Sequence, residues 1–573
     1  MKKINKLITD YWLLFVIVLL AATLRLWRLN SYPALNADEA AIGYNAYALL
    51  ETGRDEHLTS WPIHFQSFND FKPGLYFYLV LPFVKVLGLN EWAVRLPGAI
   101  LGTITVLIIY FLVKELFPRR QKFSIAEIAA LFLAISPWHI HFSRGGWEVN
   151  AATFFITTGV WLFLKGLKDS KYYLLSAFAF LLSLYAYHAA RIVVPLLGIG
   201  FLAIYRKDIF MSKNFKVLIF SFLSVILLLL PLIRDLLGPA GISRAAGVGL
   251  FADVGPLNRT NEQRGEHLDF QSIFPRLIHN KAVNYGLAFF ENWGKHFWGE
   301  FLFLSGDEIQ RNKVPETGQM YLFDILFLAV GLVSIAKLIS GPPAQDATAR
   351  RGWFLVLFWL AVAPMGAALT FQSPHALRSH NMVVPLVIIS AYGLVTVLDW
   401  TKRNIKSKNL LLTFNFAILT LISWQFARYQ HMYWVHMAKE YPFSSQYGIK
   451  ELASYVKENQ DKYRKIWVTD RYDQPYILFL FYMKYPPQKF QGNPASSDTS
   501  QGGHVLTSRD RFGFSTVRDF GKFHFEVINF DKIRPENPNT LIIGTPEEIP
   551  KEANVVKEIY GTNGHFYFKV VVN

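Results

Sequence analysis

The sequence contains no cysteine among its 573 residues. Disulfide bonds, thiolate zinc sites and thiol nucleophiles are therefore all excluded. Charged residues are also scarce, because they make up 17% of the chain, whereas a typical soluble domain carries about 25%. Hydrophobic residues make up 52% and aromatic residues 16%. So apolar a chain can bury ample surface, which excludes disorder, and its recurring apolar runs argue against a purely soluble enzyme.

Long apolar runs recur through the first three quarters of the chain. A helix needs about 20 apolar residues to cross a bilayer. We predict eleven spans, near residues 11–28, 94–117, 125–142, 150–167, 172–188, 191–205, 215–236, 320–340, 352–371, 381–399 and 409–427. The first span is not predicted to be a cleaved signal peptide, because it lacks a small-residue cleavage site and continues into Arg25, Trp27 and Arg28.

The net charge is +16, which in a soluble protein would suggest a nucleic-acid partner. Here 21 of the 58 lysines and arginines lie in six short segments: the N-terminus, 114–124, 165–171, 206–216, 337–351 and 399–408. Cytoplasmic loops of membrane proteins carry such an excess. We therefore predict a cytoplasmic N-terminus. All six basic segments fall on the cytoplasmic side only if the short apolar run 75–88 does not cross the membrane. We therefore predict that this run, which contains Pro82 and Lys85, is a helix lying at the membrane surface.

Three regions are then predicted outside the membrane: a first loop 29–93 with interfacial helices, a loop 237–319, and the segment 430–573. The last has soluble composition, with a helix-like stretch at 446–459 and strand-like runs at 465–470, 540–545 and 566–572. We predict a mostly α-helical, multi-pass cell-membrane protein with two domains. Residues 1–429 form the transmembrane domain, and residues 430–573 form a small extracytoplasmic α/β domain.

Ionisable residues gather at the predicted outer ends of the spans, in five segments far apart in the sequence. They are Asp38 and Glu39; Asp70 and Lys72; His139, His141, Arg144 and Glu148; His188 and Arg191; and His375, Arg378 and His380. Such residues are costly at membrane depth and tend to mark function. Taken singly, each has a structural interpretation. Asp38 could cap a helix, the arginines could reach from span ends to water, and the histidines could be satisfied interfacial side chains.

Taken together, carboxylates beside several cations suit the transfer of a group from a phosphate. One carboxylate takes the acceptor's proton, while arginine and lysine hold the phosphate and stabilise its charge as it leaves. Nucleotide sugars are cytoplasmic, so a lipid-carried donor fits an outer active site. The aromatic-rich flanks of the spans would hold its chain.

Several motifs around these residues resemble bacterial members of the GT-C glycosyltransferase superfamily, near the protein mannosyltransferase and aminoarabinose transferase branch. They are the Asp38-Glu39 pair after the first span, residues 72–76 (KPGLY), residues 87–88 followed by 91–97 (EWAVRLP), Ser136-Pro137, Ser143-Arg144 with Glu148, and residues 375–378 (HALR). Residues 1–200 carry most of the likeness, and residues 360–400 carry part of it. The chain departs from the pattern at Glu148, where relatives often have Asp, and at Gly74, where many have Pro.

The resemblance implies an integral membrane enzyme that takes a sugar from a polyprenyl phosphate by direct displacement at the anomeric carbon. It implies Asp38 as the catalytic carboxylate with Glu39 in support, and Lys72 and Arg378 near the donor phosphate. Combining resemblance and residue pattern, we predict three groups. The catalytic group is Asp38, Glu39 and Glu148; the phosphate-binding group is Lys72, Arg144, Arg191 and Arg378; the substrate-binding group is Asp70, His139, His141, His188 and His375.

Two questions stay open in the sequence. Asp38 and Glu148 could supply oxygen ligands for Mg²⁺ or Mn²⁺, but lysine and arginine could provide the same positive charge, so we predict no metal. In the loop 237–319, Arg244, Arg259, Arg264 and the aromatic run 289–303 could cover the carrier lipid or form an interfacial aromatic belt. The predicted partners are a polyprenyl-phosphate sugar and a lipid, glycan or protein acceptor. The alternatives are a transporter or flippase of lipid-linked sugars, and an assembly protein that works through residues 430–573.

Overall fold

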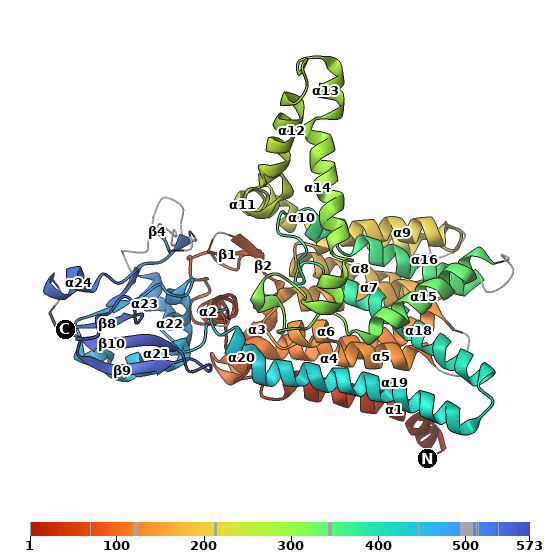
Figure 1. Ribbon diagram of the computed structural model, residues 1–573, viewed down its shortest axis with the longest axis horizontal. Coiled ribbons are helices and arrows are strands. Elements are labelled where there is room, and N and C mark those ends of the chain that lie inside the picture. The colour runs from red at the N-terminus through yellow and green to blue at the C-terminus, as the bar shows by residue number, and fades with distance from the viewer. Residues whose placement is uncertain are drawn as a thin grey trace. The chain divides into compact units, whose positions relative to one another are not determined.

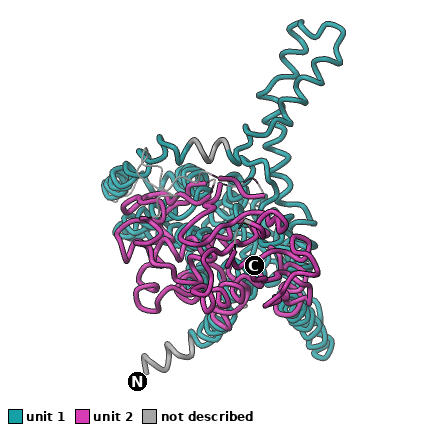
Figure 2. Tube along the Cα trace, turned by 90° about the vertical axis from the view of Figure 1, so that its left-hand side faces the viewer, with its two compact units in different colours: residues 1–25, 98–143, 148–432 teal, residues 26–97, 144–147, 433–573 magenta. Residues whose placement is uncertain are grey.

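The chain folds into two compact units (Figure 2). The computed structural model describes residues 2–68, 70–118, 124–210, 215–341, 347–444, 446–492, 508–511, 513, 515–536 and 538–573. Unit 1 comprises residues 1–25, 98–143 and 148–432, and unit 2 comprises residues 26–97, 144–147 and 433–573. The prediction separates the two domains after residue 429, whereas the fold groups the whole predicted first outer loop, residues 29–93, with the C-terminal segment in unit 2.

Helices lie at each of the eleven predicted spans (Figure 1). They are α1 (Lys2–Leu26), α4 (Glu91–Leu116), α5 (Ile125–Ile135) with α6 (Pro137–Ser143), α7 (Glu148–Gly166), α8 (Lys171–Ala186), α9 (Ala190–Phe210), α10 (Phe215–Leu236), α15 (Phe323–Ser340), α16 (Ala347–Val362), α18 (Val383–Asn404) and α19 (Lys408–His431). Within the described residues, six helices are long and apolar enough to cross a membrane, or seven if α5 and α6 count as one span. A count of eleven spans stays a prediction.

The predicted span 125–142 is not one continuous helix. It divides into α5 and α6, which meet at an angle of 57°. Pro137 begins α6 and has no backbone N–H to continue the hydrogen bonding of α5. The fully buried Arg25 satisfies carbonyls that the break leaves free, donating to Ala134 O at 3.1 Å and to Leu133 O at 3.2 Å. An arginine at the end of the first predicted span therefore stabilises a break in another helix.

The first predicted outer loop folds within unit 2 into a helix, a hairpin and a second helix. These are α2 (Ala37–Thr52), β1 (His64–Ser67) paired with β2 (Asp70–Pro73), and α3 (Leu75–Leu87). With 13 residues, α3 is shorter than a span; its position at a membrane surface stays a prediction. Gly74 lies between β2 and α3, and its N–H donates to Ile63 O at 2.8 Å, which proline could not do.

The C-terminal part of unit 2 is built on a six-stranded mixed sheet, as the α/β prediction requires. Its strands are β3 (Lys465–Val468), β6 (Asp519–Phe520), β7 (Phe523–Phe525), β8 (Thr540–Gly544), β9 (Val555–Tyr560) and β10 (Phe566–Val572), in the order β6-β7-β3-β8-β10-β9. The three predicted strands correspond to β3, β8 and β10, and the predicted helix to α21 (Ile449–Asn459).

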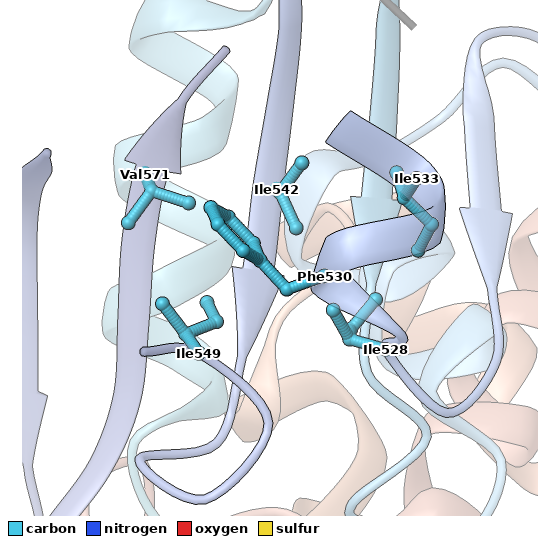
Figure 3. Close-up of a cluster of buried hydrophobic side chains, with 6 residues drawn as sticks. All are labelled: Ile528, Phe530, Ile533, Ile542, Ile549 and Val571. Carbon is cyan, nitrogen blue, oxygen red and sulfur yellow. The ribbon is translucent and has the colours of Figure 1, made fainter. Parts of the chain in front are cut away.

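One face of this sheet carries a hydrophobic cluster, which Figure 3 shows between the helix α24 (Phe530–Glu536) and the strands β8 and β10. Its buried members are Ile528, Phe530, Ile533, Ile542, Ile549 and Val571. Ile542 and Val571 lie on the paired strands β8 and β10 and are directly opposite each other in the register. This hydrophobic cluster therefore packs the segment that contains α24 against one face of the sheet.

Unit 2 also packs the loop helix α2 against the helix α22 (Pro475–Met483) of its C-terminal part. Gly43 makes this approach possible, since a Cβ atom there would lie 2.6 Å from Cε2 of Phe481 and 2.7 Å from Cγ2 of Val94. The hydroxyl of Tyr44 donates to Tyr485 O at 3.1 Å. The C-terminal part thus helps to position α2.

We expect the Gly43→Ala substitution to destabilise the protein, because overpacking costs about 1–3 kcal/mol. The matched control is Gly286→Ala, in a helix where a Cβ would meet nothing within 4 Å. There alanine should keep or raise stability, since it is the better helix former by about 1 kcal/mol. Thermal unfolding midpoints of the two variants check this. Equal changes in the unfolding midpoint of Gly43→Ala and Gly286→Ala would contradict the close packing of α2 against α22.

Candidate functional site

The N-terminus of α2 is fixed by a capping box. Asn36 is the N-cap, its side chain accepts the N–H of Glu39 at 3.0 Å, and the Glu39 carboxylate accepts the N–H of Asn36 at 3.3 Å. Gln446, from the C-terminal part, accepts the N–H of Ala37 at 2.6 Å. The interpretation of Asp38 as the helix cap is therefore wrong, because Asn36 has that role. Asp38 is the second residue of the helix and lies in its first turn, where the helix dipole favours a carboxylate.

Asp38 forms an ion pair with Lys72, which lies on β2. The Lys72 ammonium is 2.5 Å from Oδ1 of Asp38, and the two side chains are 15% and 21% exposed. The pair is thus partly open to solvent, in contrast to the buried charges around it. Asp38 and Lys72 are 34 residues apart in the sequence. Their contact places a carboxylate beside a cation, which is the combination of charges that we predicted for a group-transfer site.

Glu39 is buried and fully engaged in holding the structure together. Arg95 donates to both of its carboxylate oxygens, at 2.7 and 2.8 Å, and Gly146 N–H donates to Oε1 at 2.9 Å. Arg95 is itself fully buried and also donates to the carbonyls of Leu29 and Pro33. This bidentate pair ties the start of α2 to α4 and to residues 144–147. Glu39 thereby holds in place the start of α2, the helix that carries Asp38.

Arg144 is also buried, so it does not reach from a helix end into water. Its Nε donates to the hydroxyl of Tyr433 at 2.9 Å, and its Nη2 donates to Tyr32 O at 3.1 Å. The guanidinium lies over the rings of Tyr433 and Trp434, with its central carbon 4.7 Å from the Trp434 centroid. These contacts bind residues 144–147 to the first loop and to the start of the C-terminal part.

Glu56 is a buried carboxyl close enough to Lys72 to feel its charge, and no sequence pattern predicted it. Its Oε1 accepts from Asn45 at 2.8 Å, and its Oε2 accepts from the Tyr476 hydroxyl at 3.3 Å. Burial raises the pKa of Glu56 to about 7, although the positive charge of Lys72 opposes this rise. Burial likewise raises the pKa of the neighbouring Asp55 to about 6.

We expect Glu56 to make the folded protein less stable as the pH rises from about 4.5, its ordinary pKa, to about 7. Over this window the folded state retains a proton that the unfolded chain has lost, so stability falls by up to roughly 3 kcal/mol. Glu56→Gln should remove this fall. Unfolding midpoints measured across the window for wild type, Glu56→Gln and the exposed-carboxyl control Glu51→Gln check it. Parallel curves for wild type and Glu56→Gln would contradict the raised pKa.

Within unit 1, two of the predicted segments meet at a pair of buried histidines. The rings of His139 and His380 stack with centroids 5.5 Å apart. His139 Nδ1 is 2.7 Å from the Arg25 guanidinium and accepts its hydrogen bond, and His380 Nδ1 is 3.0 Å from the Thr153 hydroxyl. His141, close by in sequence, has Nε2 2.9 Å from Arg311 O. The two segments therefore form a polar cluster inside the helical unit.

The segment 373–380 also contacts the loop 237–319. Asp307 accepts the N–H of Ala376 at 2.6 Å, and its carboxylate is 3.6 Å from His375 Nδ1. Burial raises the pKa of Asp307. His296 accepts the N–H of His375 through Nε2 and donates through Nδ1 to Asn292 O. Burial lowers the pKa of His296 to about 4, which agrees with a neutral ring in this arrangement.

Arg378 is buried in the same segment of unit 1. Its guanidinium donates to the Thr370 hydroxyl at 2.7 Å and to Gln372 Oε1 at 3.2 Å. At the junction of α8 and α9, Arg191 lies 2.9 Å from His188 Nδ1 and donates to Leu184 O. Glu148 begins α7 and is buried. In unit 2, Asp70 accepts the N–H of Phe71 at 2.8 Å.

The predicted site residues are therefore divided between the units. Unit 2 brings together three of the five segments, through the contacts of Asp38 with Lys72 and of Glu39 with Gly146. Unit 1 brings together the segments of His139 and His380. Among the described residues, no three histidine, aspartate or glutamate side chains lie close enough to hold a metal ion. The predicted independence from metal stays a prediction.

The C-terminal part of unit 2 has a polar cavity of about 450 Å³. It lies at the carboxyl ends of the parallel strands β3 and β7, where open α/β sheets commonly bind ligands. Two ion pairs line it: Arg511 with Asp470 at 2.6 Å, and Arg518 with Glu526 at 3.1 Å. Trp467 lines it as well. Unit 2 therefore holds a polar cavity in its C-terminal part in addition to the partly exposed Asp38–Lys72 pair.

The six or seven apolar helices of membrane-crossing length among the described residues are typical of a multi-pass membrane protein, and unit 2 carries a partly exposed acid–lysine pair. Known proteins agree with this class. The family model described as dolichyl-phosphate-mannose-protein mannosyltransferase matches residues 72–233. The Bacillus subtilis protein named "Putative mannosyltransferase YkcB" is 29% identical over 108 residues, which are 19% of this chain and 14% of that protein.

Two solved structures share the fold. ArnT from Cupriavidus metallidurans, bound to undecaprenyl phosphate, has a TM-score of 0.51 at 10% identity, over 98% of both chains. The oligosaccharyltransferase AglB from Archaeoglobus fulgidus, in complex with an inhibitory peptide and a dolichol-phosphate, has a TM-score of 0.50 at 14% identity. The match covers 83% of this chain and 64% of AglB. The family model and the sequence relative match parts of this chain, and the two structures show that the chain shares their fold.

Proposed function

We propose that this protein transfers a sugar from a polyprenyl-phosphate donor to an acceptor at the outer face of the cytoplasmic membrane. The observation that carries the proposal is the partly exposed Asp38–Lys72 pair at the start of α2. The solved relatives support a lipid-linked donor, since ArnT was captured with undecaprenyl phosphate and AglB with a dolichol-phosphate. The predicted topology supports the outer face.

In the proposed step, Asp38 accepts the proton of the acceptor's hydroxyl as general base. The hydroxyl oxygen forms a bond to the anomeric carbon, and the bond between that carbon and the phosphate oxygen breaks. The polyprenyl phosphate leaves with the bonding electrons, and the Lys72 ammonium stabilises its charge. Glu39 and Arg144 hold the surrounding segments in place. Arg378 is proposed, from the resemblance alone, as a further ligand of the donor phosphate.

The test uses the purified full-length protein in lipid nanodiscs with a panel of radiolabelled polyprenyl-phosphate sugars and candidate acceptors. Release of free polyprenyl phosphate, together with labelled acceptor, is the expected result for one donor. Binding of a donor with no release in any combination would favour the alternative, a transporter or flippase of lipid-linked sugars.

Lys72→Met should lower kcat/KM for the donor by roughly tenfold to a hundredfold, because a charge-assisted hydrogen bond contributes about 1.5–3 kcal/mol. The matched control is Lys85→Met, since Lys85 is an exposed lysine on the neighbouring helix α3. The same release assay measures both variants. Equal activity of the two would remove Lys72 from the proposed site.

A further inference from the structure

A helical hairpin in the loop 237–319 projects from unit 1. It consists of α12 (Gly255–Gly265), α13 (Ile273–Ile278) at the tip and α14 (Lys281–Lys295). In Figures 1 and 2 this 255–295 hairpin stands away from the helices of unit 1 and runs across the direction of the long helices. A hairpin that crosses the direction of membrane spans runs along the plane of the membrane.

Hydrogen bonds between polar groups join the two sides of the hairpin. The Asn284 side chain on α14 is buried and donates to the Thr260 hydroxyl at 2.9 Å and to Gln263 Oε1 at 3.2 Å on α12. Near the tip, Arg264 Nε donates to His279 O at 2.6 Å. These polar contacts connect α12 and α14, while several large apolar side chains of α14 are exposed.

The outer face of α14 is an apolar stripe. Val283, Leu287 and Phe290 follow one another at spacings of four and three residues, which places them on one side of the helix. All three are exposed, Leu287 at 61% and Phe290 at 68%. The tip continues the stripe with exposed Phe270, Ile273, Phe274 and Leu277. A water-soluble hairpin would turn such side chains inward.

The outer face of α12 has the opposite character. Its buried side contains Pro256 and Thr260. On the other side, Asn258 and Glu262 are exposed, one turn apart. The hairpin is thus amphipathic as a whole, with α14 and the tip apolar and α12 polar.

The base of the hairpin is packed against the helical bundle. Trp293 donates through Nε1 to Ala361 O at 2.8 Å, and Asn292 donates to Thr370 O at 3.0 Å. Both contacts lie at the end of α16 and the short helix α17 (Met365–Ala368) that follows it. In sequence the hairpin lies between α10 and α15, both long and apolar enough to cross a membrane. Its stripe is therefore at the end of the spans, within reach of the bilayer.

We infer that the 255–295 hairpin lies on the membrane surface, with the α14 stripe and the tip inserted among lipid chains and α12 facing water. The lipid bilayer is the partner, because the hairpin is amphipathic, leaves the bundle at the end of membrane spans and runs across them. Helices of this kind bury an apolar face at the boundary between headgroups and acyl chains. This inference is independent of the proposed sugar transfer.

The absence of native cysteine makes the test direct, because one introduced cysteine can be labelled specifically. The full-length variants Phe274→Cys and Phe290→Cys probe the stripe, and Asn258→Cys on α12 is the matched control. Each is labelled with a fluorophore sensitive to polarity and placed in phosphatidylcholine nanodiscs. The quenchers are lipid carrying a nitroxide on its acyl chain and, separately, aqueous iodide.

The expected result is a blue shift at positions 274 and 290, with loss of fluorescence on adding nitroxide lipid and little loss with iodide. Position 258 should show the reverse. Labels at 274 and 290 that iodide quenches as strongly as at 258 would overturn the inference. Labels protected from both quenchers would also overturn it, since that pattern means a second copy or another protein covers the stripe.

Discussion

Replacing Asp38 by asparagine is expected to lower the rate of sugar transfer by roughly a hundredfold to ten-thousandfold, the usual contribution of a general base. Asparagine has nearly the same shape as aspartate but cannot take up the acceptor's proton. The helix does not depend on Asp38 for its cap, which Asn36 provides. The fold of α2 should therefore survive the substitution.

The measurement is release of polyprenyl phosphate per enzyme, together with the unfolding midpoint of each variant. Glu51→Gln is the control, because it removes an exposed carboxyl from the other end of the same helix. It should leave both quantities unchanged. Wild-type turnover in Asp38→Asn would exclude this residue as the base and leave Glu148 as the remaining predicted catalytic carboxylate outside the buried pair. Loss of activity with an equal loss of stability would point to a structural role.

The helical part of the fold could be predicted because it depends on local sequence. Apolar runs of span length specify helices, and each predicted span contains one. The break between α5 and α6 was missed because hydropathy counts side chains and ignores the backbone hydrogen bond that Pro137 removes. The strands β3, β8 and β10 were found from their apolar, β-branched residues. The strands β6 and β7, of two and three residues, are too short for a pattern.

The candidate site was predictable in part. Asp38 and Lys72 could be singled out because both belong to motifs that resemble the GT-C glycosyltransferases, and the structure pairs them. Glu56 could not, since nothing local distinguishes a buried carboxyl from an exposed one. Arg25 and Arg95 could have been identified from the sequence as important residues, because each is a cation within or beside an apolar run. Both are buried and have structural contacts. Arg25 donates to carbonyls at the break between α5 and α6, and Arg95 holds the carboxylate of Glu39.

The Glu39–Arg95 pair should be among the most sensitive points for stability. Removing one member of a buried ion pair typically costs about 3–5 kcal/mol, because the other charge is left without a partner. We expect Arg95→Met to lose that much free energy of unfolding, since it strands the fully buried carboxylate of Glu39. The control is Arg428→Met, which opens an exposed pair with Glu316 at 2.8 Å and should cost no more than about 1 kcal/mol.

Combining Arg95→Met with Glu39→Leu distinguishes the buried charge from lost packing. Both charges are then gone, so the double variant should recover part of the stability that Arg95→Met loses. Its transfer activity should stay low, because the start of α2 has lost its attachments to α4 and to Gly146 and no longer holds Asp38 beside Lys72. Unfolding in mixed micelles and the release assay measure the two effects. Full activity in the double variant would show that Asp38 keeps its position without the buried pair, and the positioning role given to Glu39 would be wrong.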